Sequence, residues 1–194
     1  MEYRSVVFSG LPASGKSTLS DRLHELYGWP VYSIGGLWRE KYAELYPNKK
    51  ISFEDYWKST SREDNLNMNL VAKEIFKKGN VIGDSRYAIY CKDSPEILLV
   101  LVVADLDVRA DRVFNHIRYQ GKSLKEVKHI LKKREADEVA VGKELFGKSY
   151  DYRNPIHYHL TINSGVLTVE QEVSSVRNLL EGINFKPTNI SSSL

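Results

Sequence analysis

The chain contains very little cysteine. Its 194 residues include a single cysteine, Cys91, so no disulfide bond can form within the chain. Such usage is typical of proteins in a reducing compartment, and we expect a cytoplasmic protein. The sequon that begins at Asn189, Asn-Ile-Ser, is accordingly interpreted as a coincidence, because N-glycosylation belongs to secreted proteins.

Long apolar runs and a dominant charge are also missing. No stretch approaches the roughly 18 apolar residues of a membrane span, and the start, MEYRSVVFSG, lacks the regions of a secretory signal. The formal net charge of +3 is too small to indicate nucleic-acid binding and suits an anionic small molecule equally well. We expect a monomer with small-molecule partners, and neither a membrane nor a nucleic acid among them.

Short apolar, β-branched runs alternate with longer helical patterns, which predicts an α/β domain with a parallel sheet. The expected strands cover 4–9, 30–33, 80–84, 96–104 and 158–163. After the first strand, apolar residues recur at helical spacing up to a stop at Gly28, namely Leu19, Leu23, Leu26 and Tyr27.

Three further helical regions are expected. A long helical stretch covers 52–79, and mobile, charged helices with few core positions are expected over 119–150, where Lys, Arg and Glu are dense. Thr168 and Gln171 form a capping box for a last helix that ends at Gly182. Its apolar face holds Val169, Val173, Val176 and Leu180. The polar tail after it is expected to be loosely ordered.

The stretch GLPASGKS, residues 10–17, matches the phosphate-loop pattern G-x-x-x-x-G-K-[ST], with a strand before it and a helix after it. Gly10 and Gly15 let backbone N–H groups turn toward phosphate oxygens, and the helix N-terminus adds partial positive charge. Lys16 can reach the β- and γ-phosphates, and the Ser17 hydroxyl can ligate Mg²⁺. The expected donor-binding residues are Gly10, Ala13, Ser14, Gly15, Lys16, Ser17 and Thr18.

The phosphate loop by itself does not choose among kinases, GTPases and motor ATPases. A GTPase would need a base-reading Asn-Lys-x-Asp sequence late in the chain, and there is none. Motor ATPases normally need a larger domain. Small kinases of phosphate or hydroxyl acceptors fit the length best.

Two segments at the ends of expected strands carry residues that could bind the molecule that accepts the phosphoryl group. Asp84 and Arg86 follow the third strand, where ligands lie in open α/β sheets; Asp84 can hold Mg²⁺ and Arg86 can grip a phosphate. Alternatively, the two side chains pair only with each other. After the second strand come Gly35, which permits close backbone approach, Trp38, which offers a stacking face, and Arg39, a second phosphate clamp. The alternative is a core Trp38 and a solvated Arg39.

Base recognition is expected from two amides that share one helical face, Asn65 and Asn69, since each supplies both a donor and an acceptor. The alternative, a solvated polar face, is slightly favoured because amides are common on exposed helices. His157 and His159 lie two apart in an expected strand and so share a face. No carboxylate or cysteine joins them at metal-ligand spacing, and they are interpreted as structural.

In order and spacing, GLPASGKST, SIGGLWRE, GNVIGDSR, ADLDVRADRV, KSLKEVKHILKKRE and LTINSGVLTVEQEV resemble the cytidylate kinases, especially the compact archaeal form. The resemblance covers about 3–182. It implies a P-loop kinase fold: a five-stranded parallel sheet flanked by helices in a single domain, 1–182, with a polar tail over 183–194. It places a monophosphate-binding region at about 35–79 and a lid at about 119–150. The implied reaction transfers the γ-phosphoryl group of ATP, with Mg²⁺, to CMP or dCMP.

The resemblance also implies residue roles. Arg39 and Arg86 would bind the acceptor phosphate, and Asp84 matches an acidic residue of the family. Arg134 would close on the transferring phosphate, which makes Lys16, Asp84, Arg86 and Arg134 the expected catalytic residues. Three more residues fall where the family binds the donor: Arg109, Arg112 and Asn163.

The chain departs from the family pattern at three positions. Ser85 replaces a glycine, Trp38 stands where a smaller aromatic residue is usual, and Val141 replaces a lid arginine for which Lys143 is the nearest substitute. The rival hypotheses are a kinase of another monophosphate or of a small hydroxyl metabolite, with Asp84 as base, and a nucleotide-binding regulatory module. Val141 is the feature that keeps the regulatory hypothesis open.

Overall fold

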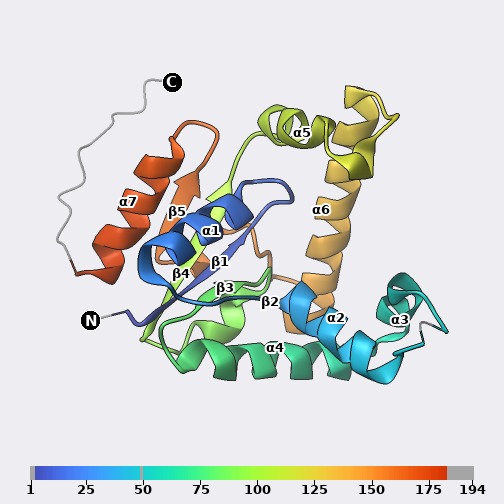
Figure 1. Cartoon of the computed structure of the whole chain (residues 1–194), viewed down its shortest axis with the longest axis horizontal. Helices are drawn as coiled ribbons and strands as arrows, with labels where there is room; N and C mark the ends of the chain where they lie inside the picture. The colour runs from blue at the N-terminus through green and yellow to red at the C-terminus, as the bar shows by residue number, and fades with distance from the viewer. Residues whose placement is uncertain (1–2, 49, 183–194) are drawn as a thin grey trace.

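The structure is a computed structural model that describes residues 3–48 and 50–182. Five parallel strands form one sheet in the order β2-β3-β1-β4-β5 (Figure 1). The strands are β1 (Ser5–Gly10), β2 (Val31–Ser33), β3 (Ile82–Asp84), β4 (Ile97–Val103) and β5 (Leu160–Asn163). All five expected strands are therefore confirmed, and so is the parallel α/β fold.

The central strands are apolar throughout because helices cover both faces of the sheet. On one face, Val6 and Phe8 pack with α1 (Lys16–Tyr27) and α7 (Val169–Leu180). On the other face, Val7 packs with α4 (Arg62–Lys77) and the short helix η1 (Ala88–Cys91). Neighbouring residues of β1 thus serve opposite cores, as the two-residue period of a strand requires.

A third group of helices lies beyond the sheet, beside the carboxyl ends of its strands. It consists of α2 (Ile34–Leu45), α3 (Phe53–Ser59), α5 (Leu106–Phe114) and α6 (Leu124–Phe146), with short helices η2 (Ile117–Tyr119) and η3 (Pro155–His157) in the connections. In Figure 1, α6 runs from α5 at one end to α2 and α4 at the other. Arg62 joins α4 to the end of α6 by donating to the carbonyls of Glu144 and Leu145 at 3.2 and 3.0 Å.

Several expectations about the helices need correction. The stretch 52–79 is two helices: α3 ends at Ser59, and Ser61 begins α4 as its N-cap, with its hydroxyl accepting from the N–H of Asp64. The region 119–150 holds one 23-residue helix, and it buries more positions than expected, among them Val127 and Leu131. Leu26 is 49% exposed, since α1 packs through the i, i+4 row of Leu19, Leu23 and Tyr27.

The capping box of Thr168 and Gln171 is confirmed at the start of α7. His157 and His159 do not share a strand face: His157 ends η3, and β5 begins only at Leu160. His159 is structural, as expected, because its Nδ1 accepts from the N–H of Leu99 at 3.0 Å. The tail and the Asn189 sequon lie outside the described residues. Among the residues described, no helix is long and apolar enough to cross a membrane.

Candidate active site

The phosphate loop joins β1 to α1 and is shaped by residues with positive φ. Gly10 has φ +138°, and a Cβ there would lie 2.0 Å from the carbonyl oxygen of Val102, so only glycine fits. Ala13 and Gly15 follow with φ 64° and 95°. This succession turns the loop over the N-terminus of α1, where Ser17 and Thr18 are exposed in the first turn. The arrangement is that of an anion-binding loop.

Lys16 is folded back onto this loop. Its Nζ donates to the carbonyl oxygens of Gly10 and Leu11 at 3.0 and 2.9 Å, and the residue is 9% exposed. Burial lowers the pKa of Lys16 to about 8, and the nearby carboxylate of Asp84 opposes that shift. The charges of Arg86, Arg134 and Glu138 also act on Lys16, so the lysine and these groups belong to one electrostatic site.

A cavity of about 500 Å³ opens beside the phosphate loop, where β2 and β3 end. Its wall brings together the acceptor-side residues expected from the sequence, which are Gly35, Trp38, Arg39, Asn65, Asn69, Asp84, Arg86 and Arg134. These residues come from α2, α4, the end of β3 and α6. Four segments far apart in the chain thus converge on one space.

The end of β3 is placed by its pairing with β1, in which Asp84 lies opposite Phe8. The next residue, Ser85, donates its N–H to the carbonyl oxygen of Phe8 at 2.9 Å. Ser85 is buried and does not have a positive φ, so serine replaces the family's glycine without backbone strain. Arg86 is ion-paired with Glu138 and not with Asp84, which removes the alternative of a simple Asp84–Arg86 pair.

Glu138 is a site residue that the sequence analysis missed. Its Oε2 lies 2.8 Å from Nε of Arg86, although that N–H is not aligned for a hydrogen bond, and its Oε1 accepts from Nε of Arg134 at 2.9 Å. The hydroxyl of Tyr152 donates to Oε2 at 3.0 Å. The i, i+4 spacing of Arg134 and Glu138 on one helix was the available signal; the partner Arg86, 52 positions away, gave none.

Aromatic side chains form one side of the cavity. Trp38 is fully buried in a cluster with Tyr56 and Met68, and Trp57 meets its ring edge-to-face, with centroids 5.3 Å apart. Trp38 is therefore a core residue and a cavity residue at once. Arg39 is exposed, its Nη1 donates to the carbonyl of Gly35 at 3.0 Å, and its Cζ lies 5.3 Å from the centre of the Phe53 ring.

The two amides of α4 differ in their surroundings. Asn65 uses its Nδ2 on Ser61 and Thr60, whereas Nδ2 of Asn69 donates to the carbonyl of Asn65 at 2.7 Å. Asn69 is 4% exposed, and its Oδ1 has no partner among the described residues. Asn69 is thus not on a solvated face, and its buried amide oxygen Oδ1 lacks a hydrogen-bond donor among the described residues.

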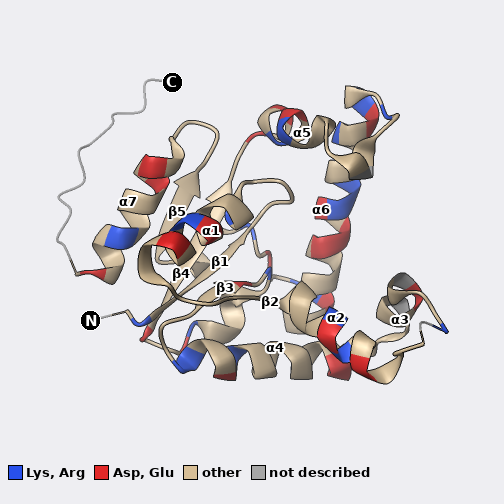
Figure 2. Ribbon diagram, in the orientation of Figure 1, with Lys and Arg blue, Asp and Glu red and all other residues tan. Residues whose placement is uncertain are grey.

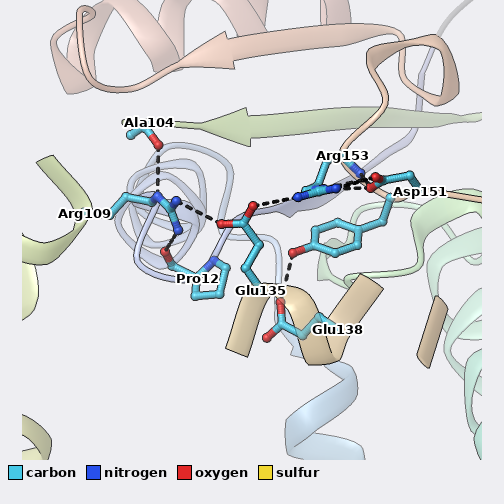
Figure 3. A network of polar contacts seen from close by, with 8 residues as sticks. Pro12, Ala104, Arg109, Glu135, Glu138, Asp151 and Arg153 are labelled. Carbon is cyan, nitrogen blue, oxygen red and sulfur yellow. Dashed lines mark hydrogen bonds and ion pairs between the residues drawn. The ribbon is translucent and has the colours of Figure 1, made fainter. Parts of the chain in front are cut away.

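Arg109 and Arg112 reach the phosphate loop through its backbone. Buried Arg109 donates to the carbonyls of Ala104 and Pro12 at 2.9 and 3.2 Å and to Glu135 on α6 at 3.0 Å (Figure 3). Arg112 donates to the backbone and hydroxyl of Ser164 at 2.6 and 2.9 Å and lies 3.4 Å from the carbonyl of Ser14. Binding of donor phosphates by these two arginines stays a prediction.

The remaining expected positions are spread around the same edge. Asn163 ends β5 and its Oδ1 accepts from the N–H of Gly165 at 3.0 Å; its proximity to a donor adenine stays a prediction. Val141 is 40% exposed in the cavity wall. Lys143 is exposed and is not part of the cavity wall; the pKa of Asp151 is lowered by hydrogen bonds from Arg153 and, to a smaller degree, by the charges of Arg153 and Lys143.

The residues present fit a magnesium ion that is held mainly by a nucleotide. Among the residues that the structure describes, no three His, Cys, Asp or Glu side chains gather as a metal site. Mg²⁺ in kinases is bound by one or two protein groups together with substrate phosphates. Ser17 is exposed in the first turn of α1, and Asp84 lines the cavity and acts on the charge of Lys16, so each offers an oxygen donor; their binding of Mg²⁺ stays a prediction.

Comparisons with known proteins agree with this geometry. The sequence model of the cytidylate kinase-like family matches residues 6–166. A cytidylate kinase from Desulfurococcus amylolyticus is 26% identical over 182 residues, which cover 92% of this chain and 93% of that protein.

Solved structures share the fold at low sequence identity. An uncharacterized protein from Eubacterium ventriosum superposes with a TM-score of 0.66 at 16% identity, over 91% of this chain and 98% of the other. Shikimate kinase from Bacteroides thetaiotaomicron superposes with a TM-score of 0.57 at 17% identity, over the same shares of the two chains. These likenesses establish the P-loop kinase fold.

Proposed function

This chain belongs to the cytidylate kinase-like family, and we propose that it transfers the γ-phosphoryl group of ATP to the phosphate of CMP or dCMP. One observation supports this acceptor most directly. Arg39, Asp84, Arg86 and Arg134 line a single cavity, and the charges of Asp84, Arg86 and Arg134 act on the phosphate-loop lysine. A site with three guanidinium groups is suited to an acceptor that is itself a phosphate.

The donor binds on the phosphate loop. The N–H groups between Gly10 and Thr18 and the N-terminus of α1 hold the β- and γ-phosphates. Lys16 exchanges the carbonyls of Gly10 and Leu11 for phosphate oxygens when ATP arrives. Ser17 and Asp84 would hold Mg²⁺, which when bound would neutralise negative charge on the phosphates. In this proposal Arg109 and Arg112 lie near the donor phosphates, and Asn163 lies near the adenine.

The acceptor lies in the cavity with its phosphate toward the loop. Arg39 and Arg86 fix that phosphate, and Arg134 on α6 neutralises the charge that develops during in-line transfer. The lid of about 119–150, which carries α6, excludes water from the reacting groups. A general base is not needed, because the attacking phosphate oxygen already carries negative charge.

Asn69 reads the base. Its Nδ2 is bound to the helix backbone, which leaves Oδ1 as an acceptor without a partner in the cavity wall. A buried acceptor without a partner is costly, and the 4-amino group of cytosine is a donor. Uracil presents an acceptor at the same position, so this arrangement favours cytosine. The aromatic side chains of Trp38, Phe53 and Trp57 provide the apolar wall beside the ring.

The test is a coupled assay of ADP release with ATP, Mg²⁺ and a panel of nucleoside monophosphates. We expect strong stimulation by CMP and dCMP and weaker stimulation by UMP. The Asn69→Ala variant is expected to lower the ratio of kcat/KM for CMP to kcat/KM for UMP by about 10-fold. A change of this size corresponds to the loss of one or two hydrogen bonds. A matched control is Asn67→Ala, on an exposed face of α4.

Other outcomes would favour the alternatives. Stimulation only by another monophosphate, or only by hydroxyl metabolites, would replace the acceptor and leave the kinase reaction in place. ATP binding with no transfer to any acceptor would favour a nucleotide-binding regulatory module. Either result would overturn the proposed function.

A further inference from the structure

Two of the arginines assigned to phosphates contact the same carboxylate. Arg86 follows β3 and Arg134 lies on α6, and each approaches Glu138 through its Nε, at 2.8 and 2.9 Å. Resting on the proposed function, we infer that Glu138 is a positioning residue, whose carboxylate sets the direction of both guanidinium groups so that their outer nitrogens face the phosphates.

The use of Nε is the central observation. Neither terminal nitrogen of Arg86 or Arg134 has a partner among the described residues, and the two side chains are 34% and 40% exposed. The two terminal nitrogens of a guanidinium group present parallel N–H groups that can bind two phosphate oxygens. Glu138 therefore lies next to Nε of both arginines, as an ion pair with Arg86 and as a hydrogen-bonded ion pair with Arg134, and leaves their terminal nitrogens to a phosphate.

The carboxylate is itself held firmly. Glu138 is 8% exposed, and the fully buried Tyr152 donates its hydroxyl to Oε2 at 3.0 Å. Burial and the adjacent Glu138 raise the pKa of Tyr152, so its hydroxyl keeps the donated proton. The hydroxyl of Tyr87 donates to the backbone carbonyl of Glu138 at 3.0 Å. A buried carboxylate that is held by Tyr152, on a backbone that is held by Tyr87, is able to orient two flexible side chains.

The placement of Glu138 also joins the two halves of the acceptor site. Figure 2 shows that α6 carries charges of both signs along its length, and Figure 3 shows Glu135 of α6 reaching Arg109 and Arg153, with Glu138 close by on the same helix. Glu135 binds the buried Arg109 beside the phosphate loop, whereas Glu138 binds Arg86 beside the acceptor. One turn of α6 thus holds arginines of both the donor and acceptor sides.

The first experiment compares kcat and KM of Glu138→Gln with those of the wild-type enzyme. Glutamine keeps the size and loses the charge that both arginines face. We expect kcat with CMP to fall by about 10- to 100-fold, because small misplacements of positioning groups have effects of this size. The KM for ATP is expected to stay within about 2-fold. Glu144→Gln, an exposed residue of the same helix, is the matched control and is expected to keep wild-type kinetics.

A double-mutant cycle separates positioning from a general structural effect. Because Glu138 is inferred to act through Arg134 and Arg86 together, Glu138→Gln is expected to slow Arg134→Met by a smaller factor than it slows the wild-type enzyme. Additive losses would overturn the inference. A Glu138→Gln variant with unchanged kcat and a lower KM for CMP would also overturn it, since the carboxylate would then be a competitor of the phosphate.

A measurement without turnover keeps the inference separate from the proposed function. In ¹⁵N-arginine NMR spectra of the whole chain, lysine variants assign the Nε–H signals of Arg86 and Arg134. Relaxation of these signals is expected to show ordered side chains in the wild type and in Glu144→Gln. Both are expected to become mobile in Glu138→Gln. Unchanged signals in Glu138→Gln would refute the positioning role whatever the substrate is, while inactivity of the wild type with every monophosphate would refute only the proposed function.

Discussion

The protonation of Lys16 makes ATP binding dependent on pH in a direction that the structure fixes. The ammonium group is buried against two carbonyl oxygens, and burial lowers its pKa from 10.5 to about 8. A bound triphosphate adds negative charge beside it, and an opposite charge favours the protonated form. ATP binding should therefore raise the pKa of Lys16 back toward its ordinary value.

The expected size follows from the two pKa values. Their difference corresponds to about 3 kcal/mol of coupling between the proton and the phosphates. Between pH 7 and pH 9 the free protein loses the Lys16 proton and the complex keeps it, so the affinity for ATP should weaken by about 10-fold. The unliganded fold shows the opposite trend. Since the unfolded chain binds the proton more tightly between pH 8 and 10.5, the free energy of unfolding should rise with pH in that window.

Isothermal titration with ATP and Mg²⁺ at pH 7, 8 and 9, at constant ionic strength, measures the effect. Repeating the titration at pH 8.5 in buffers of different ionisation enthalpy should show proton uptake on binding. Lys16→Arg is the control, because its guanidinium stays charged over this range and its affinity for ATP should not vary with pH. A wild-type affinity that is constant from pH 7 to 9, or an equal slope in Lys16→Arg, would refute the reasoning.

Three further predictions concern the loop, its support and α6. Gly10→Ala should lower the free energy of unfolding in urea by more than about 3 kcal/mol, because its Cβ would meet Val102; Gly28→Ala, with nothing within 4 Å, should cost only about 1 kcal/mol. Arg109→Met should lower that free energy by about 3 kcal/mol, and normal stability with lost ATP affinity would instead show direct donor binding. Val141→Arg, in the cavity wall, should raise kcat with CMP by about 10-fold or more, whereas an unchanged kcat would show that an arginine at this position has no access to the phosphates.

The features that the sequence predicted well are local ones. Strand β1, the loop and α1 follow from residues that are neighbours in the chain, since Gly10, Gly15 and Lys16 act through backbone geometry within one turn. Asp84 and Arg86 were found for a related reason: the end of a parallel strand is a known place for ligands. Where a break depended on one capping hydroxyl, as at Ser61 between α3 and α4, the periodicity of the flanking residues hid it.

The sequence by itself determined the five strands, the phosphate loop and the set of cationic side chains available to an acceptor, because short-range backbone preferences and apolar periodicity encode them. Only the tertiary structure decided how those side chains are used. It buried Arg109 under the loop, left the amide oxygen of Asn69 without a partner, and set Glu138 between Arg86 and Arg134. Each of these outcomes depends on packing between residues that are distant in the chain, which no local pattern specifies.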